Sequence, residues 1–149
     1  TRSLWKAQFG PTTIELVDTH MTRRMISIHA APQRRLRVND QSFDGIRGEP
    51  PCYWQTAKHW VFVSERVADH QSTTALIVVN RVSGKVAVCR GPDVGSLGHY
   101  FGLPSASGQT VVQCVAESED EMVIAYPVGA RTCKITADLD RQSFALEYE

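Results

Sequence analysis

The pattern of apolar and polar residues predicts β-strands over most of the second half of the chain. Residues 60–63 are aromatic and β-branched, and residues 73–79 form the most strand-like run in the sequence. Residues 80–84 then read as a hairpin turn in which Gly84 can adopt a positive φ, with residues 85–89 as the returning strand. The apolar residues of this hairpin are continuous rather than alternating. We therefore expect the hairpin to be central in its sheet and covered on both faces.

Four further strands are expected at 110–116, 122–127, 131–136 and 143–148, with polar turns between them. Their regular spacing is typical of an antiparallel meander. Residues 34–38 add a short basic strand, and no period of 20 to 50 residues repeats along the sequence. The expected fold is mainly β (or α+β), a single domain over residues 1–149 built on one antiparallel sheet.

Residues 12–29 fit two interpretations. Thr12 and Glu15 match a capping box, and apolar residues recur at steps of three or four from Ile14 to Ile28, which predicts one N-terminal helix packed on the sheet. The opposing interpretation is a hairpin with strands at 13–17 and 25–29, favoured by the many Thr and Ile residues.

The cysteines predict two disulfides. Cys52, Cys89, Cys114 and Cys133 are even in number, with no C-x-x-C pair of the kind that zinc sites use. The favoured pairs are Cys52–Cys89 and Cys114–Cys133, although Cys89–Cys114 also stays open. Disulfides imply an oxidising compartment, here the periplasm or the outside of the cell. The alternative is four reduced, buried cysteines that act as small apolar residues.

The first residues fit two origins of the sequence. The chain starts at Thr1 without a Met, as it would if a signal peptide had been removed or the sequence trimmed.

The net charge of the chain is uninformative, but the distribution of charged residues along the chain is not. The 16 basic and 16 acidic residues cancel, which argues against a nucleic-acid partner. The longest strictly apolar run, residues 75–79, is too short to span a membrane. However, residues 1–37 hold seven basic and two acidic residues, whereas residues 117–149 hold eight acidic and three basic ones. Either the two ends pair within the fold, or one of them steers a partner.

No motif for common catalytic chemistry is present. Phosphate-binding loops, dinucleotide fingerprints, zincin motifs and nucleophile elbows are all missing. The acidic residues near 117–121 and 138–140 match no calcium loop. We expect no catalytic residue, no metal and no cofactor. The five histidines are scattered singly, at positions 20, 29, 59, 70 and 99.

The candidate partner-binding residues lie in two loops. Residues 91–108 are dense in Gly and Pro, which predicts a long irregular loop, and long loops often carry function. This loop holds His99, Tyr100 and Phe101, while the acidic turn at 118–121 adds Glu119 and Asp120. Tyr53 and Trp54 either line a binding face or pack around a disulfide.

Residues 60–63 and 75–86, with the turn Asn80-Arg81-Val82-Ser83-Gly84-Lys85-Val86, resemble a hairpin of small bacterial domains. That set includes immunity proteins that neutralise secreted antibacterial toxins, and related periplasmic inhibitors. The resemblance implies a non-enzymatic protein that occludes a partner protein such as a secreted toxin or enzyme. The alternatives are a small hydrolase with a dispersed His and acid site, which needs a histidine next to a carboxylate or cysteine, and a small-ligand-binding β domain.

Overall fold

A computed structural model of the chain describes residues 2–9, 11–18, 34–46, 54–68, 71–90 and 112–149. These residues form twelve strands joined by turns, which confirms the expected mainly β fold. The strands make three antiparallel sheets of four, where the sequence predicted one sheet. Among the described residues, no helix has the length and apolarity needed to cross a membrane.

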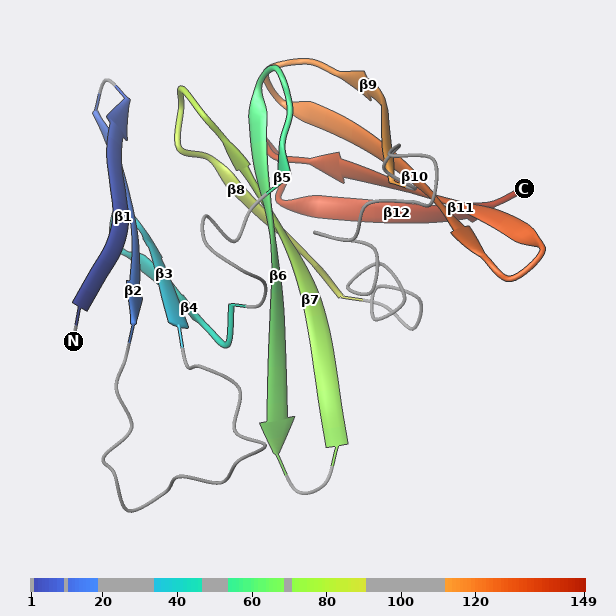
Figure 1. Ribbon diagram of the computed structural model, residues 1–149. Coiled ribbons are helices and arrows are strands. Elements are labelled where there is room, and N and C mark those ends of the chain that lie inside the picture. The colour runs from blue at the N-terminus through green and yellow to red at the C-terminus, as the bar shows by residue number, and fades with distance from the viewer. Residues whose placement is uncertain (1, 10, 19–33, 47–53, 69–70, 91–111) are drawn as a thin grey trace, which may run out of the picture.

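Each sheet is a meander in chain order (Figure 1). The N-terminal sheet contains β1 (Arg2–Phe9), β2 (Thr12–Asp18), β3 (Arg34–Val38) and β4 (Gln41–Asp44). The middle sheet contains β5 (Trp54–Gln55), β6 (His59–Ala68), β7 (Gln71–Asn80) and β8 (Val86–Arg90). The C-terminal sheet contains β9 (Gln113–Glu117), β10 (Glu121–Val128), β11 (Arg131–Asp138) and β12 (Ser143–Tyr148), so the last four predicted strands are all present.

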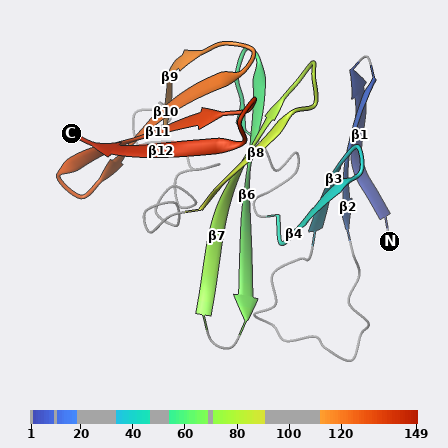
Figure 2. The ribbon, with the colours of Figure 1, turned by 180° about the vertical axis from the view of Figure 1, so that it is seen from behind.

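The middle sheet lies between the other two, as Figures 1 and 2 show from opposite sides. Strand β7 explains why. Its Ile77 and Val79 pack with the N-terminal sheet, whereas Leu76 and Val78 pack with the C-terminal sheet. Side chains alternate across a strand, so a strand buried on both faces must be apolar at every position. The predicted cover on both faces is confirmed, but only β7 of the hairpin is central, because β8 lies at the edge of the sheet.

The helix predicted for residues 12–29 is wrong over residues 12–18, which form β2. Ile14 and Leu16 are fully buried while Glu15 between them is half-buried, so the alternation of a strand governs this segment. The helical stripe counted Ile14 and Val17 and left out Leu16, although all three are buried. The first strand of the alternative hairpin is therefore correct. Its second strand, at 25–29, lies outside the described residues.

One backbone hydrogen bond recurs at the same place in every sheet. The amide of Asn39 donates to Thr13 O, that of Arg81 to Lys58 O and that of Leu139 to Asp120 O, at 2.8–2.9 Å. Each bond lies directly beyond a strand pair: Ile14 with Val38, His59 with Asn80, and Glu121 with Asp138. The three sheets therefore share one arrangement, a four-stranded antiparallel meander that closes its second strand pair in the same way.

The middle and C-terminal sheets share further detail. Asn80 Oδ1 accepts from the amides of Val82 and Ser83, and Asp138 Oδ1 accepts from those of Asp140 and Arg141. Four residues after each capping residue the backbone has a positive φ, at Gly84 (74°) and at Gln142 (55°). The predicted turn at 80–84, with its glycine in the left-handed region, is confirmed.

Candidate interaction surface

Turns from all three sheets join into one surface, which we call the turn face. It consists of residues 39–40, 56–58, 81–85, 118–120 and 139–142. Figure 1 shows three of these turns, those that follow β5, β7 and β9, toward the same end of the molecule. Hydrogen bonds between side chains of one sheet and turns of another hold the surface together.

The strongest link is Glu117, at the end of β9. One carboxylate oxygen accepts from the amide of Ala57, at 3.0 Å. The other accepts from Thr56 Oγ1 and His59 Nδ1, both at 2.8 Å, and from the amide of Lys58 at 3.3 Å. The side chain of Glu117 thus binds the C-terminal sheet to the turn between β5 and β6.

These contacts set the electrostatics of Glu117. Burial alone raises the pKa of its carboxyl group, but the hydrogen bonds from His59, Thr56 and the Lys58 amide, with the charge of His59, outweigh burial. The pKa therefore lies below its ordinary value, and the carboxylate is the form that the structure stabilises. A carboxylate only accepts hydrogen bonds, so His59 carries a proton on Nδ1.

Asn80 and Lys85 make the second link between the middle and C-terminal sheets. Asn80 is buried, and its side-chain amide donates to Glu119 O at 2.5 Å. Lys85 Nζ lies 3.2 Å from Asp120 Oδ1 and 3.0 Å from Asp140 Oδ1, so one cation bridges two turns of the C-terminal sheet. The two carboxylates raise the pKa of Lys85.

The N-terminal sheet joins the same surface at Gly84. Thr12 Oγ1 donates to Val82 O at 3.3 Å, and Asn39 Oδ1 accepts from the amide of Thr13 at 3.0 Å. A Cβ on Gly84 would lie 2.5 Å from Thr12 Oγ1 and 3.1 Å from Asn39 Nδ2. Only glycine fits here, both for its φ of 74° and for this close approach.

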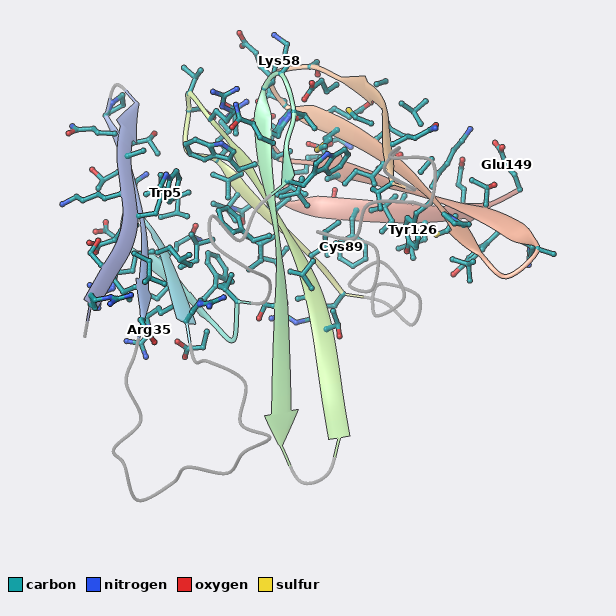
Figure 3. All side chains as sticks on the ribbon, in the orientation of Figure 1. Trp5, Arg35, Lys58, Cys89, Tyr126 and Glu149 are labelled. Atoms are coloured by element: carbon teal, nitrogen blue, oxygen red, sulfur yellow. The ribbon has the colours of Figure 1, made fainter. Side chains whose placement is uncertain are left out.

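On this framework, the outward-facing side chains differ in character. Val82 is 71% exposed at the tip of the turn between β7 and β8. Lys58 is exposed in the turn between β5 and β6 and is labelled at the top of Figure 3. The C-terminal sheet contributes the exposed acids Glu119 and Asp140. The turn face therefore carries an exposed apolar residue, an exposed cation and exposed carboxylates.

Two of the five predicted partner-binding residues belong to this surface. Glu119 is exposed, and Asp120 is exposed but paired with Lys85. His99, Tyr100 and Phe101 lie outside the described residues. Sequence reasoning missed Glu117, Asn80 and Lys85, because their partners are 35 to 61 residues away along the chain. The one usable signal was the turn beginning at Asn80.

The predicted disulfides are wrong for the three cysteines that the structure describes. Cys89, Cys114 and Cys133 are free thiols, and Cys52 lies outside the described residues. Cys89 and Cys133 are buried between the middle and C-terminal sheets, where thiols act as small apolar groups, and Figure 3 labels Cys89 there. Burial and the neighbouring Cys133 raise the pKa of Cys89 to about 12.

The described tryptophans serve the core rather than a binding face. Trp60 is buried, and Trp5 meets it edge to face with ring centroids 5.2 Å apart. Trp54 packs against the core between the middle and C-terminal sheets. Tyr53 lies outside the described residues.

The hydrolase alternative requires a histidine next to a carboxylate or a cysteine, and the described residues contain one such contact. His59 meets Glu117, and the other four histidines lie outside the described residues. The side chain of His59 is 0% exposed, and Glu117 accepts three hydrogen bonds from the turn before His59 in addition to the one from His59. A general base must reach a substrate proton, so this buried pair is built as a structural clamp. In the part of the chain that is described, no three His, Cys, Asp or Glu side chains gather as a metal site would need.

The oppositely charged ends of the chain lie on the two outer sheets. Arg35 pairs with Asp44 and Arg37 with Glu15 inside the N-terminal sheet, while Lys134 pairs with Glu149 inside the C-terminal sheet. Figure 3 shows Arg35 and Glu149 on opposite sides of the molecule. The middle sheet separates the two ends.

Comparison with known proteins adds no further constraint. A scan against protein-family models, a search of curated proteins and a search of solved structures each found no match.

Proposed function

We propose that this protein is a non-enzymatic binding module that docks a partner protein on its turn face. The observation that carries the proposal is the way in which Glu117, Asn80 and Lys85 fix the turns of separate sheets into one surface. Turns that only connect strands need no such links. A surface held rigid before binding loses less conformational entropy when a partner docks, which favours recognition.

The chemistry of the turn face suits a protein partner. Val82 offers exposed apolar area, and Lys58, Glu119 and Asp140 add exposed charges to the same surface. Protein interfaces combine an apolar centre with a polar rim in this way.

We further propose that this protein occludes its partner and so acts as an immunity or inhibitor protein of the bacterial periplasm or cell exterior. This narrower proposal rests on the resemblance of residues 80–86 to the hairpin of such proteins. The turn of that hairpin lies in the turn face and carries Val82.

The test is affinity capture from the native host with matched baits. The unaltered protein should capture a partner that the Val82→Asp variant fails to retain, because a carboxylate at the centre of the interface would be buried without a cation. Ala130→Asp is the control, since Ala130 is also exposed but lies in the turn between β10 and β11, outside the turn face. Identical capture by the unaltered and Val82→Asp baits would overturn the proposal, as would the absence of any captured protein.

A further inference from the structure

Each sheet has two faces, which we name by the order of the sheets along the chain. The forward face is the one toward the next sheet, and the backward face is the one toward the preceding sheet. The forward face of a sheet packs on the backward face of the next sheet along the chain. Ile14 and Leu16 of the N-terminal sheet pack in this way on Trp60 and Phe62 of the middle sheet. The forward face of the middle sheet, which includes Val61 and Val63, packs on Met122 and Ile124 of the C-terminal sheet.

Two faces of the stack have no such neighbour in the chain that the structure describes. They are the backward face of the N-terminal sheet and the forward face of the C-terminal sheet. Where the middle sheet has Trp60 and Val79 on its backward face, the N-terminal sheet has Glu15 and Arg37 at the matching positions, 3.7 Å apart.

The forward face of the C-terminal sheet is mixed. Val123 and Ala125 occupy the positions of Val61 and Val63, so this part stays apolar. Lys134 replaces Leu76 on the neighbouring strand. Ala145 lies next to Thr136 on this face and is exposed.

The two faces are complementary in charge. Strand register places three cations and two carboxylates on the backward face of the N-terminal sheet: Lys6, Arg35, Arg37, Glu15 and Asp44. It places four carboxylates and one cation on the forward face of the C-terminal sheet: Glu121, Asp138, Glu147, Glu149 and Lys134. Opposite net charge attracts the two unlike faces, whereas two copies of the acidic face repel each other.

We infer that two copies of this chain associate head to tail, with the forward face of one C-terminal sheet on the backward face of the other copy's N-terminal sheet. This contact repeats between molecules the order in which the sheets stack within one molecule. Since charge carries much of the attraction, the association weakens as salt rises. A head-to-tail contact uses two different surfaces, so it can close a ring or extend further.

Two variants each block one face. Ala145→Arg places a large cation on the forward face of the C-terminal sheet. Ser42→Glu places a carboxylate on the backward face of the N-terminal sheet, where Ser42 is exposed opposite Arg37. Neither residue is in the turn face, so these variants leave the surface of the proposed function intact. Ala130→Arg is the exposed control.

Sedimentation velocity at low and high salt gives the readout. The unaltered protein and Ala130→Arg should associate at low salt and separate at high salt, while each blocked variant alone stays monomeric. An equal mixture of the two blocked variants should form a one-to-one dimer, because each still carries the face that the other lacks. A monomer at all salt concentrations would overturn the inference. So would a Ser42→Glu variant that still dimerises alone, because that result indicates packing between two like faces.

Discussion

His59 Nδ1 lies 2.8 Å from Glu117 Oε2, and this bond joins the middle sheet to the C-terminal sheet at a point where the imidazole has no exposed area. The same carboxylate holds the turn that precedes His59. A single acidic side chain therefore fixes both the start of β6 and the position of one sheet against the next.

Replacing Glu117 with Gln should cost about 2–3 kcal/mol of unfolding free energy, because hydrogen bonds to a charged acceptor are lost and buried donors are left without it. Urea titration followed by tryptophan fluorescence measures the change. Glu119→Gln is the matched control, since Glu119 takes part through its backbone oxygen and its side chain is exposed. Equal stability of the two variants would show that Glu117 is not a clamp.

The lowered pKa of Glu117 makes part of the stability depend on pH. The unfolded carboxyl titrates near 4.5 and the folded one below that value, so its contribution is complete above about pH 4.5 and is lost as pH falls through the folded pKa. The stability difference between the unaltered protein and Glu117→Gln should therefore shrink below pH 4.5. A difference that stays constant down to pH 3 contradicts the argument.

Gly84→Ala should destabilise far more than Gly129→Ala. Both glycines have a positive φ, which costs about 1–2 kcal/mol for an L-residue. Only at Gly84 does the new Cβ also collide with Thr12, whereas nothing lies within 4 Å at Gly129. We expect a loss of about 1 kcal/mol at Gly129 and of more than about 3 kcal/mol at Gly84, since overpacking adds roughly 1–3 kcal/mol. Thermal unfolding of both variants decides this, and equal losses would mean that the N-terminal sheet does not reach this turn.

The free thiols predict an order of chemical modification. Cys89 has its pKa raised to about 12 and is buried, and Cys133 is buried beside it. Cys114 is partly exposed, although burial and Glu117 raise its pKa as well. In a Cys52→Ser background, a maleimide should modify Cys114 first, and the other two only after unfolding. Equally fast modification of Cys89 in the native protein contradicts the burial described above.

The sequence predicted strands better than it predicted their assembly. Residues 75–79 are apolar on both faces, so their place in a central strand follows from local composition. The division into three sheets does not follow from composition. Apolar and polar residues alternate along a strand in the same way whether the strands form one sheet or three. At residues 12–18, a short strand with Leu16 and Val17 both buried imitates helical spacing.

The candidate surface was predictable only where a turn has its own signature. Asn80 and Gly84 mark their turn in the sequence because one caps two amides and the other needs a positive φ. Glu117 has no such mark. Its importance comes from Thr56 and His59, which the packing of two sheets brings to it. Long-range contacts of this kind leave no pattern in a single sequence.

Amide hydrogen exchange tests most directly whether the turn face is one preorganised surface. Exposed turns normally exchange at nearly the rate of an unfolded chain. The amides of Ala57, Lys58, Val82, Ser83 and Asp140 should instead be protected, because each donates to a side-chain oxygen: the first two to Glu117, the next two to Asn80 and the last to Asp138. Glu117→Gln should remove protection from Ala57 and Lys58 and leave Asp140 protected. Free exchange of these amides in the unaltered protein would contradict the account.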